Sequence, residues 1–146
     1  MEAENPSQVP ALARRSNLPD VTAPDGSEIR LLIDQRHQAS AVSMVEVTLP
    51  AGQVSRPVWH QQVEEVWYVL QGQGDVWRCP PDADPALYPP VTVKPGDSLV
   101  IPPRWQFQFS ASPDAELRFL CFTVPPWSGD DEAQPAEFGG LGPATV

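Results

Sequence analysis

Apolar and polar residues alternate along most of this chain in short runs that end at proline or glycine. The clearest run covers residues 41–49, where Ser43, Val45, Val47 and Leu49 fall on one face. Such a two-residue period is typical of β-strands, and 19 prolines in 146 residues exclude long helices. The pattern predicts strands over residues 28–33, 41–49, 54–60, 65–70, 75–79, 91–93, 98–101, 105–110 and 116–124. Short strands joined by turns predict an all-β barrel or sandwich.

The two ends of the chain lack this alternation. Residues 1–27 hold four prolines among polar residues and predict an irregular N-terminal arm, and residues 127–146 predict a C-terminal tail. We therefore expect one barrel domain over residues 28–126, close to the ordinary size of a single domain. An arm of this length needs a surface to lie on, such as the sheet edge of a second subunit, so we expect a homodimer.

Composition narrows the range of partners. Nine basic residues against 19 acidic ones give a formal net charge of -10, which would repel nucleic acid and anionic membranes. The first residues are acidic rather than basic, and no apolar stretch is long enough to span a bilayer, so we expect a soluble, cytoplasmic protein. Cys79 and Cys121 are interpreted as reduced packing residues with no chemical role.

Five residues stand at the spacing of a known motif: Gly52, Val58, His60, Glu65 and Gly72. The first cupin motif runs Gly, five residues, His-x-His, three or four residues, Glu, six residues, Gly. Residues 96–103, Gly-Asp-Ser-Leu-Val-Ile-Pro-Pro, open like the second cupin motif. Over residues 50–111 the chain therefore resembles the cupin superfamily. The resemblance implies an antiparallel β-barrel, or double-stranded jelly roll, that is often dimeric.

The sequence departs from the family at the positions that bind metal. The resemblance implies four ligands, but Val58 replaces the first histidine and Phe107 replaces the third, so only His60 and Glu65 remain. Valine and phenylalanine offer no lone pair to a metal ion. We therefore favour a barrel without a tightly bound metal. Gln106 leaves a second hypothesis open, because a register shift would bring its amide oxygen into a rebuilt site for iron, manganese, nickel or zinc.

His60 and Glu65 have a structural and a functional interpretation. Strand alternation places His60 on the face of Val58 and Arg56, and the resemblance turns this face into the barrel. A buried carboxyl group needs a partner, so we expect Glu65 to meet His60, Arg56 or both. The contact either stabilises the core or forms an acid/base pair that moves a proton on a ligand.

The aromatic residues predict a small organic molecule in the barrel. Trp67 shares the face of Glu65, and Phe107 and Phe109 share a face of another strand. Pockets for organic ligands are mostly apolar and aromatic, so these rings and Val58 are candidate binding residues. Arg56 would either hold a carboxylate or phosphate of the ligand or neutralise Glu65.

Three functional hypotheses follow, and fold alone does not choose between them. The preferred one is a metal-free cupin that binds a small molecule and acts as an isomerase, cyclase or lyase through His60 and Glu65. The second is a metal-dependent dioxygenase or isomerase with a rebuilt ligand shell. The third is a non-catalytic binding or assembly protein with a solidly packed barrel.

Overall fold

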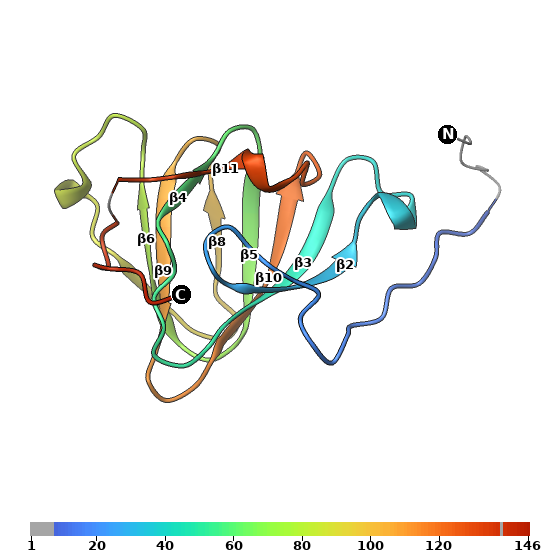
Figure 1. Cartoon of the computed structure of the whole chain (residues 1–146), viewed down its shortest axis with the longest axis horizontal. Coiled ribbons are helices and arrows are strands. Elements are labelled where there is room, and N and C mark those ends of the chain that lie inside the picture. Colours follow the sequence, from blue (N-terminus) through green and yellow to red (C-terminus); the bar gives the residue numbers. More distant parts are fainter. Residues whose placement is uncertain (1–7, 138) are drawn as a thin grey trace.

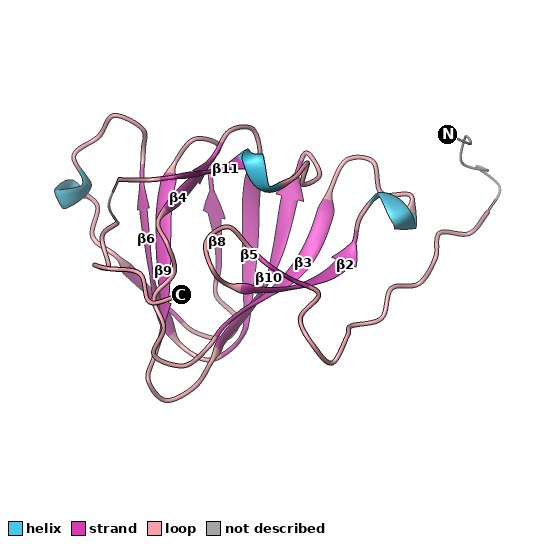
Figure 2. Cartoon of the chain, viewed as in Figure 1, coloured by secondary structure: helices cyan, strands magenta, loops and turns pink. Residues whose placement is uncertain are grey.

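The computed structural model describes residues 8–137 and 139–146, and strands make up most of it (Figures 1 and 2). The strands are β1 (Val21–Thr22), β2 (Glu28–Ile33), β3 (Ser43–Leu49), β4 (Val58–His60), β5 (Glu64–Gln71), β6 (Gly74–Cys79), β7 (Val91–Val93), β8 (Ser98–Ile101), β9 (Gln106–Ala111), β10 (Leu117–Val124) and β11 (Ala133–Pro135). The described helices are single 3-10 turns of three residues, η1 (Gln35–His37), η2 (Pro85–Leu87) and η3 (Asp130–Glu132). In the described part of the chain, no helix has the length and apolar character needed to cross a membrane.

The strands form two antiparallel sheets. One has the order β1-β2-β3-β10-β5-β8 and the other the order β11-β4-β9-β6-β7. Chain neighbours such as β3 and β4 lie in different sheets, as in a jelly roll, which confirms the predicted all-β fold. Two predicted strands begin later than expected. Strand β3 begins at Ser43 instead of residue 41, and β4 begins only at Val58 instead of residue 54, because Pro57 has no N–H to donate and Val54 forms just an isolated bridge to Ser110.

Aromatic side chains from both sheets meet in the core. Trp67 on β5 stacks on Phe119 of β10, with ring centroids 3.9 Å apart, and Phe109 of β9 lies edge-on to both rings. All three are almost fully buried. The alternation of β5 therefore places Trp67 inside the barrel. Its neighbours Val66 and Tyr68 lie on the outer face and are 40% and 43% exposed.

The C-terminal residues are part of the fold. Strand β11 pairs with β4, and the segment after it crosses the outer face of the five-stranded sheet (Figure 1). There the fully buried Gln108 donates to the carbonyl of Gly142 at 2.8 Å and accepts from the amide of Leu141 at 2.9 Å. A Cβ atom at Gly140 would overlap the indole of Trp77, so glycine allows this close packing.

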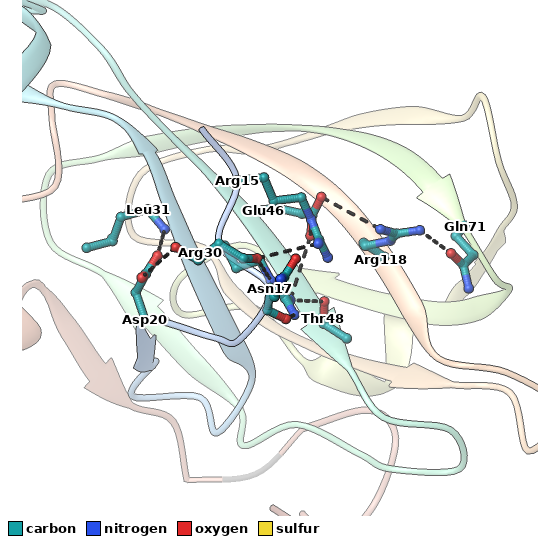
Figure 3. A network of polar contacts seen from close by, with 10 residues as sticks. Arg15, Asn17, Asp20, Arg30, Leu31, Glu46, Thr48, Gln71 and Arg118 are labelled. Carbon is teal, nitrogen blue, oxygen red and sulfur yellow. Dashed lines mark hydrogen bonds and ion pairs between the residues drawn. The ribbon is translucent and has the colours of Figure 1, made fainter. Parts of the chain in front are cut away.

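The N-terminal arm is fixed to the six-stranded sheet by charged side chains (Figure 3). Arg15 donates to the buried Glu46 on β3 at 2.8 Å, and Arg30 on β2 donates to the carbonyls of Ser16 and Asn17, each at 2.9 Å. Arg118 lies on the other side of Glu46 at 3.9 Å. These contacts hold residues 15–17, and farther along the arm Nε2 of Gln38 donates to the carbonyl oxygen of Gln8 at 3.3 Å.

Candidate functional site

A cavity of about 190 Å³ lies inside the barrel. Strands of both sheets contribute to its wall, as do the turn between β1 and β2 and the segment that follows β10. Most of the lining side chains are aliphatic or aromatic, and a few polar groups stand among them. This composition is typical of a site for a small organic molecule, and the barrel is not packed solid.

The polar end of the cavity is built around His60 and Glu65. His60 ends β4 and Glu65 lies near the start of β5, and their side chains are only 7% and 9% exposed. Nδ1 of His60 is 3.2 Å from Oε2 of Glu65, and Oε1 of Glu65 accepts a hydrogen bond from Nε1 of Trp67 at 2.8 Å. Within the described residues, Nδ1 has no partner with good hydrogen-bond geometry. The pair is thus in electrostatic contact while the imidazole keeps hydrogen-bonding capacity.

Two aromatic rings hold the imidazole. Phe107 meets His60 edge-on at 5.2 Å, and Trp127 does so at 5.0 Å. Trp127 is fixed in turn by its amide, which donates to Oγ of Ser43 at 3.1 Å. The orientation of His60 therefore depends on the segment after β10 as well as on the barrel strands.

A second carboxyl group, Asp25, reaches the cavity from the turn between β1 and β2. Its Oδ1 accepts hydrogen bonds from the amide and the hydroxyl of Ser27, at 2.9 and 2.6 Å. Burial raises the pKa of Asp25 above its usual 3.8, and the nearby negative charge of Glu65 raises it further. Asp25 was not among the predicted site residues: Pro-Asp-Gly-Ser at residues 24–27 predicts a turn, but not that this turn reaches residues 60 and 65.

Cys121 on β10 also lines the cavity, and it pairs in register with Trp67 on the adjacent strand β5. Burial raises the pKa of its thiol well above 9.0, and the negative charge of Glu65 adds to the effect. A thiol held in its protonated form is a poor nucleophile. This agrees with the interpretation of Cys121 as a packing residue.

Three of the five predicted ligand-binding residues lie in the cavity wall beside His60 and Glu65. They are Val58, Trp67 and Phe109. Phe107 is buried behind His60 and does not line the cavity. Arg56 is exposed, outside the cavity, and its Nε donates to the carbonyl oxygen of Val146 at 2.9 Å. The expectation that Arg56 faces inward was wrong, because the alternation that it assumed is interrupted at Pro57.

The residues at the family's metal positions do not fit a metal centre. Val58 and Phe107 face each other in register on β4 and β9, and Gln106 pairs with Trp59 on the opposite face. The register shift that would bring Gln106 to the site is therefore not present. Among the described residues, no three His, Cys, Asp or Glu side chains are grouped so that they could hold a metal ion.

The two sheets, the cavity and the position of His60 and Glu65 define a cupin barrel. The sequence matches the cupin domain family over residues 45–123, more than half of the chain, and the protein belongs to this family. An uncharacterized protein of Methanocaldococcus jannaschii is 30% identical over 108 residues, which is 73% of this chain and 80% of the relative.

Solved structures with the same fold differ widely in function. The nucleoside dehydratase Pac13 of Streptomyces has a TM-score of 0.58 at 15% identity, with 87% of each chain covered. A predicted oxalate decarboxylase of Thermotoga maritima has a TM-score of 0.60 at 18% identity, covering 79% of this chain and 99% of that one. The coconut allergen cocosin has a TM-score of 0.62 at 17% identity over 73% of this chain, which spans only 28% of the length of cocosin.

Proposed function

We propose that this protein is an enzyme that binds a small organic molecule in the barrel and moves a proton on it through His60 and Glu65. The reaction class is that of a lyase, isomerase or cyclase, in which breaking a C–H bond is the demanding step. The observation that carries the proposal is the buried contact of 3.2 Å between the two side chains in the cavity wall.

The residues divide the work as follows. His60 takes a proton from a carbon atom of the ligand, and Glu65 stabilises the imidazolium that forms. Trp67 holds the carboxyl group of Glu65 in place through its indole N–H. In a dehydration, the C–O bond on the neighbouring carbon then breaks, and the imidazolium returns its proton to the departing hydroxide, which leaves as water.

The likeness to Pac13 supports this class of reaction. That protein is described as a nucleoside dehydratase, and a variant with one histidine replaced by glutamine has been solved with uridine. The match covers 87% of both chains. A dehydratase with this fold therefore supports lyase chemistry as the reaction class proposed here.

Incubation with candidate compounds in D2O tests the proposal. The panel contains small cyclic hydroxy compounds and amines, with uridine included, and mass spectrometry detects loss of water or uptake of deuterium. We expect the wild type to change at least one compound and the His60→Gln and Glu65→Gln variants to lose that activity. His37→Gln is the control, because His37 is the only other histidine and caps η1 instead. An unchanged panel, or equal turnover by His60→Gln, would refute the acid/base role.

We further propose that the protein is a cytoplasmic homodimer. Cys79 and Cys121 are both buried and unpaired, which suits a reducing compartment. Val9 and Leu12 are 89% and 75% exposed on the N-terminal arm, and a second copy of the chain would cover them. Nucleic acid and membranes are not among the partners in this proposal.

A further inference from the structure

We propose that the ligand of the cavity is a small cyclic amine, bound as a cation, rather than a carboxylate or phosphate. This inference deepens the proposed function, because it concerns the same cavity and names the chemical class of its ligand. It replaces the expectation that Arg56 holds an anionic ligand, since Arg56 does not reach the site.

The charged groups that line the cavity are carboxyl groups. They come from four separate segments: Asp25, Asp34, Glu65 and Asp130. Asp34 is neutralised by Arg36 at 3.0 Å and Asp130 is exposed, so Asp25 and Glu65 are the two buried carboxyl groups of the cavity. Among the described residues, no lysine or arginine lines the cavity. An anion would therefore find carboxyl groups and no such basic partner in a mostly apolar cavity, whereas a cation would find acceptor oxygens that stabilise it.

The polar groups inside are also incompletely satisfied. The His60 side chain is only 7% exposed, and among the described residues its Nδ1 makes no hydrogen bond of good geometry, although Oε2 of Glu65 is 3.2 Å away. A buried polar atom without a partner is costly, and such atoms in a cavity wall point to a ligand that supplies the missing bond. The negative charge of Glu65 also raises the pKa of Asp25, and a bound cation would relieve this repulsion.

Size and wall composition define the rest of the ligand. An engineered apolar cavity of about 150 Å³ holds benzene, so the cavity of about 190 Å³ here has room for one ring with a short substituent. Trp127 also lines it, and an ammonium group close to the face of its indole would gain cation–π stabilisation. An amine on a single ring matches the apolar wall, this indole and the carboxyl groups together.

Three probes of equal ring size separate the possibilities: benzylamine, benzyl alcohol and benzoate. Isothermal titration at pH 7 measures their binding to the wild type, to Asp25→Asn and to Glu65→Gln, each shown to be folded by circular dichroism. Asp114→Asn is the matched control, since it removes an exposed carboxyl group outside the cavity.

We expect benzylamine to bind the wild type at least about tenfold more tightly than benzyl alcohol, a difference of about 1.4 kcal/mol, and benzoate not to bind. Asp25→Asn and Glu65→Gln should each lose most of this preference, and Asp114→Asn should keep it. Benzoate binding as tightly as benzylamine, binding by none of the probes, or a preference unchanged in both cavity variants would overturn the inference.

The failure of this inference is distinguishable from failure of the proposed function. Turnover that requires His60, together with preferred binding of benzoate, would leave the acid/base role intact and reject the cationic ligand. A clear preference for benzylamine without turnover of any compound would retain the cationic ligand and reject catalysis.

Discussion

Replacement of Trp67 by phenylalanine tests how the carboxyl group of Glu65 is held. Trp67 is 1% exposed, and its Nε1 donates the 2.8 Å hydrogen bond to Oε1 of Glu65. Trp67→Phe removes this donor and leaves the buried Oε1 of Glu65 without a hydrogen bond, which lowers the free energy of unfolding by about 1–3 kcal/mol. The smaller ring also leaves unfilled volume beside Phe119, which costs about 1–2 kcal/mol more. We therefore expect unfolding to become easier by about 2–5 kcal/mol, or by roughly 5–15 °C in Tm.

Urea unfolding followed by circular dichroism measures this loss without depending on tryptophan fluorescence. A double-mutant cycle with Glu65→Gln isolates the contact between the two side chains, and the coupling should be at least about 1 kcal/mol. Trp59→Phe is the control, because Trp59 is half-buried on the outer face of β4. A cost below about 1 kcal/mol for Trp67→Phe, or additive effects in the cycle, would show that the indole does not position Glu65.

Three further predictions concern other parts of the molecule. Because burial and Glu65 raise the pKa of Asp25 above 3.8, its ionisation costs folding free energy once the pH rises through the folded-state pKa. Asp25→Asn should therefore be more stable than wild type at pH 7 but not at pH 3. If urea unfolding gives the same stability difference between the two proteins at both pH values, the prediction is contradicted. Gly140→Ala should destabilise the fold by about 1–3 kcal/mol, because a Cβ atom overlaps Trp77, and an unchanged Tm would argue against the packed C-terminal segment. Removal of residues 1–13 should weaken a dimer measured by light scattering, and an unaltered oligomer would exclude the arm from the interface.

The sequence predicts the parts of the site that depend on local spacing. Both cupin motifs could be found from glycine, proline and glutamate positions, and with them the meeting of His60 and Glu65. The same spacing showed that Val58 and Phe107 replace two of the histidines that bind metal in the family. Strand alternation also placed Trp67 and Phe109 inside correctly, because each strand has only two faces.

Long-range packing sets the remainder of the site, and the local pattern does not contain it. Asp25 is forty residues before Glu65, and nothing in its own turn indicates that the turn reaches the cavity. Trp127 follows two prolines that mark the end of the last long strand, yet its ring packs on His60. Arg56 was misplaced because Pro57 ends the two-residue period that the prediction extended through it.

The order of the C-terminal segment was equally inaccessible from its composition. Residues 127–146 have no strand period, so they predicted a tail. The position of residues 140–142 is fixed by hydrogen bonds to Gln108 and by the contact that Gly140 permits with Trp77. Each of these partners lies on a strand more than 30 residues earlier, where alternation alone would leave Gln108 and Trp77 facing solvent.

Elemental analysis tests most directly whether the cavity works through its own side chains. Untagged wild-type protein and His60→Ala are purified without chelators and analysed side by side for iron, manganese, nickel and zinc. We expect no near-stoichiometric metal in either protein, because Val58 and Phe107 leave only two of the four ligand positions occupied by donors. A near-stoichiometric metal in the wild type that is lost in His60→Ala would show instead that the protein is a metal-dependent cupin.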